Sequence, residues 1–124
     1  MAIRPAQSTS LIKPFLISLG TFLGQLTLAG NRPIYAKELD IKQLLIEGFQ
    51  SEKMRYVVIF VCRILKECAK STIFKHSNPW VRANLEVLRE IYDWAAANNK
   101  PNYPYNEVLL EIDGLFKSFT NLNL

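Results

Sequence analysis

The feature that most constrains this chain is the long apolar segment at residues 52–71. Its apolar side chains recur at the i, i+3, i+4, i+7 spacing of one helix face. They are Met54, Val57, Val58, Val61, Ile64, Leu65 and Cys68. Residues 56–61 also suit a strand, because β-branched and aromatic residues favour strands. No turn residue interrupts residues 53–71, so we predict a helix. Ile59, Phe60 and Cys62 widen its apolar face, and neighbouring helices must therefore cover more than one side.

The segment before it, residues 11–29, is also amphipathic. Gly20 and Gly24 lie four residues apart on one face, where a second helix can approach closely. Ser10 is the predicted N-cap, which leaves Pro14 in the first turn, and Gly30 is the predicted left-handed residue after the helix. A basic start and small residues near Ala29 also resemble a secretory signal peptide, so a secreted protein cleaved after Ala29 stays an alternative. Residues 15–29 are too short for a membrane span, and we expect no membrane partner.

Three more helices are predicted from their start signals. Asp40 is a cap for residues 41–49, with Gln43 placed to complete a capping box and Phe49 facing inward. Ser51 is the predicted cap of the central helix. Asn78 followed by Pro79 begins a helix that runs to residue 97. The last helix is predicted over residues 105–119.

Five helices with short connections predict an all-α fold, in which antiparallel helix pairs stack as a HEAT-like solenoid. A closed bundle gives the same pattern, so the two architectures stay open. We expect residues 1–10 and 120–124 to be flexible tails around a helical-repeat domain at residues 11–119.

Residue types that catalyse reactions or bind metals are sparse. His76 is the only histidine and has no ligand at metal spacing, while Cys62 and Cys68 lack an activating neighbour. We therefore expect no enzyme activity, cofactor or metal. The net charge of +4 suits an acidic protein or RNA, so an RNA-binding helical-repeat module of translation or mRNA turnover is the alternative function.

Several short segments match one family in both order and spacing. They are Leu19-Gly20, Leu23-Gly24, Thr27-Leu28-Ala29, Pro33-Ile34, Leu39-Asp40, Val57-Val58, Phe60-Val61 and Asn78-Pro79-Trp80. Over most of residues 11–119 the chain resembles the middle domain of the large scaffold subunit of the CCR–NOT deadenylase complex. That domain is HEAT-like and related to the middle of translation initiation factor four-G. It is longer in the family, so we expect this chain to be its C-terminal part.

The resemblance implies a scaffold in mRNA deadenylation and translational repression. Its partners would be the Caf-type exonuclease subunit, a DEAD-box RNA helicase and other CCR–NOT subunits, with RNA contacted only indirectly. It would work in the cytoplasm, in P-bodies, and also in the nucleus. We expect partner contacts at matched positions, which are Arg32, Pro33, Lys42, Arg55, Asn78 and Trp80. Without the earlier helices of the longer domain, residues 11–29 would expose a leucine-rich face, and we expect the isolated chain to self-associate.

Overall fold

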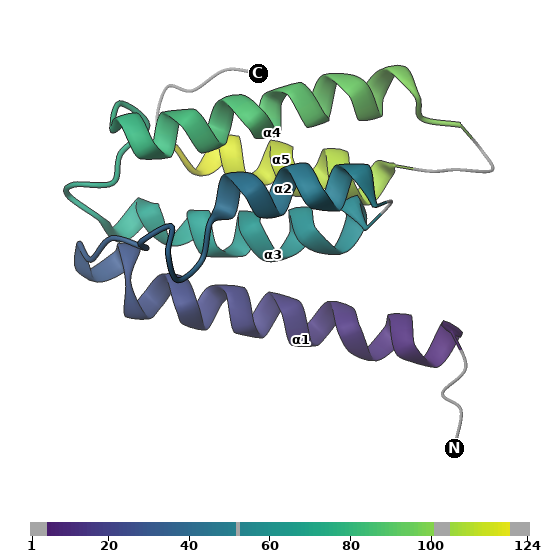
Figure 1. Ribbon diagram of the computed structural model, residues 1–124, viewed down its shortest axis with the longest axis horizontal. Helices are drawn as coiled ribbons and strands as arrows, with labels where there is room; N and C mark the ends of the chain where they lie inside the picture. The colour runs from purple at the N-terminus through teal and green to yellow at the C-terminus, as the bar shows by residue number, and fades with distance from the viewer. Residues whose placement is uncertain (1–4, 52, 101–104, 120–124) are drawn as a thin grey trace.

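The central apolar helix is the element around which the others pack. In the computed structural model, which describes residues 5–51, 53–100 and 105–119, α3 (Met54–Lys66) contacts α1 (Pro5–Leu26), α2 (Ile41–Gln50) and α5 (Asn106–Ser118) (Figure 1). The remaining helix, α4 (Pro79–Ala97), packs on α2 and α5. Residues 56–61 are helical, so the helix prediction is confirmed and the strand alternative is wrong.

The helices stack as antiparallel pairs. α2 and α3 form one pair and α4 and α5 the next, so that α2 lies against α4 and α3 against α5 (Figure 1). α1 lies along α3 on the side away from α4. All the regular structure in the described residues is helical, including two short 3-10 turns, η1 (Leu28–Gly30) and η2 (Glu67–Lys70). The predicted all-α stack of helix pairs is confirmed.

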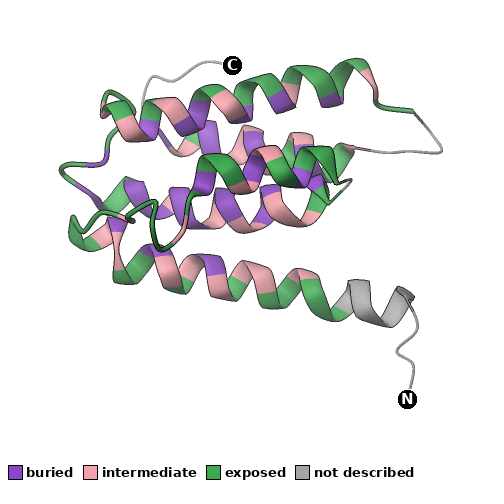
Figure 2. Cartoon of the chain, in the orientation of Figure 1, coloured by how far each residue is buried: buried purple, intermediate pink, exposed green. Residues whose placement is uncertain are grey.

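The core explains why α3 is so apolar. Six of its side chains have no exposed surface: Val58, Ile59, Val61, Cys62, Ile64 and Leu65. Figure 2 shows the buried positions concentrated on α3 and on the sides of the other helices that face it. Full burial of each aliphatic side chain contributes about 1.5–3 kcal/mol. An apolar face this wide is buried only because three helices, α1, α2 and α5, cover it.

The predicted glycine face of α1 forms the contact with α3. Both Gly20 and Gly24 are buried. A Cβ at Gly20 would lie 2.7 Å from the carbonyl oxygen of Phe60, and one at Gly24 would lie 2.6 Å from that of Ile64. The two helix backbones therefore approach as closely as they do because these positions lack side chains. Such packing favours residues 11–29 as part of the domain over a cleaved signal.

The start of α1 differs from the prediction. The helix begins at Pro5, so Ser10 is not its N-cap and Pro14 lies inside the helix rather than in its first turn. Pro5 at the first helical position loses no hydrogen bond, and no residue from there to position 10 forbids helical backbone. By length and composition alone, Leu11–Gly30 is long and apolar enough to cross a membrane, contrary to our expectation, although core helices and signal sequences meet the same criterion. Residues 1–4 and 120–124, predicted as parts of tails, lie outside the described residues.

The left-handed residue after α1 is Asn31, with φ 62°, and not Gly30. The 3-10 turn η1 includes Gly30, so the left-handed position falls one residue later, at Asn31. Asparagine tolerates the left-handed conformation better than most residues do. Its side-chain oxygen accepts hydrogen bonds from Ser71 Oγ at 2.8 Å, Thr72 N at 2.9 Å and Ile73 N at 3.3 Å. One side chain thus joins the loop after α1 to the loop before α4.

Two of the predicted helix caps are confirmed and two predictions are wrong. Asp40 accepts from the backbone N–H of Gln43 at 3.0 Å, and Asn78 accepts from the N–H groups of the first turn of α4. The Gln43 side chain does not complete the capping box, because it donates to Glu47 instead. Ser51 ends α2, and the residue that precedes α3 is Lys53, which forms no side-chain cap.

Ion pairs tie α5 to the layer below it. Arg63 on α3 makes a bidentate pair with Glu111 on α5, with N–O distances of 3.0 and 2.9 Å. The hydrogen bond to Glu111 raises the pKa of Arg63 above its ordinary value. Lys13 on α1 reaches Glu107 on α5 at 3.2 Å. The partly buried Arg63–Glu111 pair therefore links α3 to α5, whereas the exposed Lys13–Glu107 pair adds little.

Candidate partner-binding surfaces

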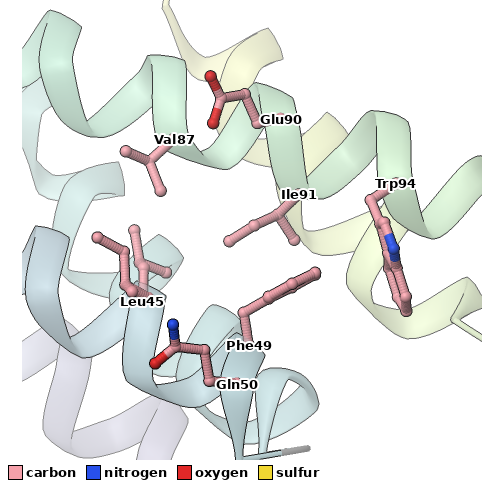
Figure 3. Close-up of a pocket in the computed structure, with 8 residues that line it drawn as sticks. Leu45, Phe49, Gln50, Val87, Glu90, Ile91 and Trp94 are labelled. Atoms are coloured by element: carbon pink, nitrogen blue, oxygen red, sulfur yellow. The ribbon is translucent and has the colours of Figure 1, made fainter.

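A groove of about 310 Å³ lies between α2 and α4. Its floor is aliphatic, its end is aromatic, and its polar rim consists of Gln50 and Glu90 (Figure 3). The lining residues are Leu45, Ile46, Phe49, Gln50, Val87, Glu90, Ile91 and Trp94. We call this feature the α2–α4 groove.

The groove arises because α2 and α4 carry wider apolar faces than the core covers. Phe49 follows Leu45 by one helical turn, and Trp94 follows Val87 by two. The prediction that Phe49 faces inward is wrong, since its side chain and that of Trp94 are each 38% exposed. The helical period identifies the face of a residue but does not show how far the neighbouring helix extends over it.

Aromatic contacts hold the end of the groove in place. The rings of Phe49 and Trp94 meet edge to face with centroids 5.0 Å apart, and the Tyr105 ring also contacts Trp94, with centroids 5.2 Å apart. Such pairs are worth roughly 0.5–1.5 kcal/mol beyond burial. The indole of Trp94 is therefore restrained by contacts with two rings, while part of Trp94 stays accessible.

The charge of Glu90 distinguishes it from its neighbours on α4. Arg82 pairs with Glu86 at 3.3 Å and Arg89 with Asp93 at 3.4 Å, each one helical turn apart. Within the described residues Glu90 has no ion pair. An unpaired carboxylate thus borders an apolar groove.

A second hollow lies near the start of α4. It is lined by His76, Ser77, Arg82, Leu85, Glu86, Arg89 and Phe116. The basic groups Arg82 and Arg89 are already paired with acidic residues on the same helix. Because both arginines are paired, the hollow carries little net positive charge.

The face of α1 turned away from α3 exposes a stripe of large apolar side chains. It consists of Leu11, Phe15, Phe22 and Leu26, each more than half exposed. The positions are spaced by four, seven and four residues, which places them on one side of a helix. The predicted exposed apolar face of this helix is present, and we call it the α1 stripe.

The structure does not bring the six predicted partner-binding residues into one site. Arg32 and Pro33 are exposed in the loop after η1, and Lys42 is exposed in the first turn of α2. Arg55 is exposed at the start of α3, at the opposite end of the helix stack from these loops (Figure 1). Their role in partner binding stays a prediction.

The remaining two predicted residues lie at the start of α4. The Asn78 oxygen accepts from Trp80 N and Val81 N, so it is engaged in the helix cap. Trp80 is half-buried, with its ring 5.9 Å from that of Phe74. Phe49, Glu90 and Trp94 are not among the six predicted partner-binding residues, although the size of Trp94 and its place near a helix end are a usable signal.

Reactive chemistry has no evident site in the described residues. Burial raises the pKa of the Cys62 thiol far above its ordinary range, and the nearby Glu111 carboxylate adds to the effect. Burial also raises the pKa of Cys68 to about 12, with a contribution from Glu67. Both thiols are therefore protonated at neutral pH. The described part of the chain contains no group of three or more His, Cys, Asp or Glu that could hold a metal ion.

Comparisons with known proteins agree with the fold. A family model described as the CCR4-NOT transcription complex subunit 1 CAF1-binding domain matches residues 3–123. General negative regulator of transcription subunit 1 of Schizosaccharomyces pombe is 38% identical over 93 residues, which cover 75% of this chain and 4% of that protein. The protein of the same name from Saccharomyces cerevisiae is 36% identical over 107 residues, 86% of this chain and 5% of the relative. CCR4-NOT transcription complex subunit let-711 of Caenorhabditis elegans is 33% identical over 127 residues, 89% of this chain and 5% of the relative. The chain thus spans only a small part of these relatives.

Proposed function

Because this chain belongs to the family of CCR4-NOT transcription complex subunit 1 CAF1-binding domains, which are non-catalytic scaffold domains, we propose that it docks a CAF1-type deadenylase. Docking would hold the nuclease within the larger assembly and so direct the shortening of poly(A) tails. The chain contributes a rigid surface to this process and no reacting group.

The observation that carries the proposal is the match over residues 3–123, which includes every helix of the stack. The surface chemistry supports it. Protein partners bind most strongly to partly exposed aromatic residues in well-packed surroundings. The α2–α4 groove offers Phe49 and Trp94 in that state.

A direct binding measurement tests the proposal. The purified chain is mixed with a purified CAF1-type deadenylase after nuclease treatment, and the complex is followed by isothermal titration calorimetry and by size-exclusion chromatography. We expect a one-to-one complex that persists without RNA. If the two proteins elute separately at tens of micromolar, even when the scaffold is extended to the full domain of its relatives, the proposal is wrong.

We also propose that the same scaffold recruits a DEAD-box RNA helicase and so links deadenylation to translational repression. The proposal is supported by the resemblance noted in the sequence and by the second hollow near the start of α4, which shares no lining residue with the α2–α4 groove. Two partners can therefore bind at once. A ternary complex in analytical ultracentrifugation is the expected result, and mutually exclusive binding would contradict it.

Residence in cytoplasmic P-bodies, with a nuclear fraction, follows from this role and is likewise a proposal. A fluorescent fusion should gather in the foci that hold decapping factors. A diffuse signal that is unchanged when deadenylation is blocked would count against it.

A further inference from the structure

We propose that the α2–α4 groove binds an amphipathic helix of the CAF1-type deadenylase, which inserts one aromatic or long aliphatic side chain and sets a lysine or arginine against Glu90. This inference rests on the proposed function, since it assigns the surface and the chemistry through which that docking takes place. The juxtaposition that carries it is an open apolar groove, a restrained tryptophan and an unpaired carboxylate on one helix face.

The size and shape of the groove indicate a single anchoring side chain. With a volume of about 310 Å³ and eight lining residues, the groove has room for one or two large side chains and not for a whole helix. The walls are two helices that start at the same end of the molecule (Figure 1). A helix laid along such a groove can insert residues at i, i+3 and i+4 spacing, a recurring mode of peptide recognition.

The aromatic end of the groove suits an anchor because it is already ordered. Phe49 and Tyr105 both contact the Trp94 ring, with centroid distances of 5.0 and 5.2 Å. Little side-chain freedom remains to be lost when a partner packs against it, which favours binding. The floor formed by Leu45, Val87 and Ile91 supplies the apolar contact (Figure 3).

The charge of Glu90 indicates which type of partner residue lies next to the anchor. Glu90 lines the groove, and the described residues provide it with no cation. The arginines on the same helix, Arg82 and Arg89, are paired with Glu86 and Asp93. Glu90 is the only charged residue that lines the groove, and it has no ion-pair partner in the described chain. A basic residue of the deadenylase, one helical turn from the anchor, would therefore provide that partner.

Calorimetric titration of the deadenylase into variants of the chain tests the inference. Trp94→Ala removes half of the aromatic end, and Glu90→Lys reverses the rim charge while leaving the apolar lining in place. Leu110→Ala is the matched apolar control, because Leu110 is 70% exposed on α5, outside the groove. Glu38→Lys is the matched charge control, in the exposed loop before α2. Circular dichroism verifies that each variant is folded.

We expect Trp94→Ala and Glu90→Lys each to weaken binding about 10- to 100-fold, the range typical of central interface residues, with both controls within about twofold of wild type. Glu90→Gln should also reduce the salt dependence of the dissociation constant, which a purely steric effect would not do. If the wild-type chain binds and all groove variants bind equally well, the inference is overturned and the proposed function stands. If neither the wild-type chain nor the scaffold extended to the full domain of its relatives binds, both the inference and the proposed function are overturned.

Discussion

Replacing Gly24 by alanine tests the packing of α1 against α3. An added Cβ would lie 2.6 Å from the carbonyl oxygen of Ile64 and 2.8 Å from the Cβ of Glu67, so the two helices must separate. Overpacking of this kind costs about 1–3 kcal/mol. The higher helix propensity of alanine returns about 0.8–1 kcal/mol. The net expectation is a loss of up to about 2 kcal/mol in the free energy of unfolding, or several degrees in melting temperature for a chain of this size.

Gly114→Ala is the matched control. Gly114 is also helical, on α5, but a Cβ there meets nothing closer than the Lys66 Nζ at 3.5 Å. The gain in helix propensity is then not offset by a steric cost, and the variant should be more stable than wild type by about 0.8–1 kcal/mol. Urea unfolding followed by circular dichroism measures both variants, with equal denaturant slopes required for the comparison.

The two substitutions must therefore move stability in opposite directions. If Gly24→Ala stabilises the chain as much as Gly114→Ala does, α1 does not lie against α3 through its glycine face. That result would also revive the signal-peptide interpretation of residues 11–29, because a helix that is to be removed needs no close contact with the core.

Three further predictions concern other parts of the chain. Asn31→Gly keeps the left-handed backbone but removes the oxygen that accepts from Ser71, Thr72 and Ile73, so urea unfolding should show a loss of about 1–3 kcal/mol. Phe22→Ser interrupts the α1 stripe and should reduce concentration-dependent light scattering by the isolated chain; equal scattering by the wild type and the variant would contradict the role of the stripe. Cys62 and Cys68 should react with a thiol reagent at pH 8 only as fast as the chain opens. Because their pKa values are raised by folding, the stability they contribute is intact below the ordinary thiol pKa of about 8.5 and declines as pH rises above it.

A scaffold of this kind depends on rigidity more than on reactivity. The bidentate pair between Arg63 and Glu111 holds α3 and α5 in register, and the close contact at Gly20 and Gly24 does the same for α1 and α3. Asn31 does the same for the loops at one end of the stack. A docking surface formed by two helices keeps its shape only if the layer beneath it is fixed.

Local sequence determined most of the helices and several of their ends. The apolar period of α3, the cap at Asp40 and the Asn78-Pro79 start each depend on residues within one or two helical turns, and the structure confirms all three. The glycine face of α1 was also visible, since a four-residue spacing fixes which side of a helix a residue occupies. The family resemblance came from the order of short segments and is confirmed by the match over residues 3–123.

Tertiary structure decided how far each face is covered. Phe49 and Trp94 lie on apolar faces that the helical period identifies, but their exposure depends on where the neighbouring helix ends. The single left-handed position in the described residues, Asn31, is stabilised by acceptor contacts to residues forty positions away. Glu90 becomes distinctive only when every other charge on α4 has found its partner and an apolar groove is seen beside it. Helical periodicity is a short-range property of the chain, whereas exposure and unpaired charge arise from contacts between residues far apart in the sequence, and these exist only in the folded stack.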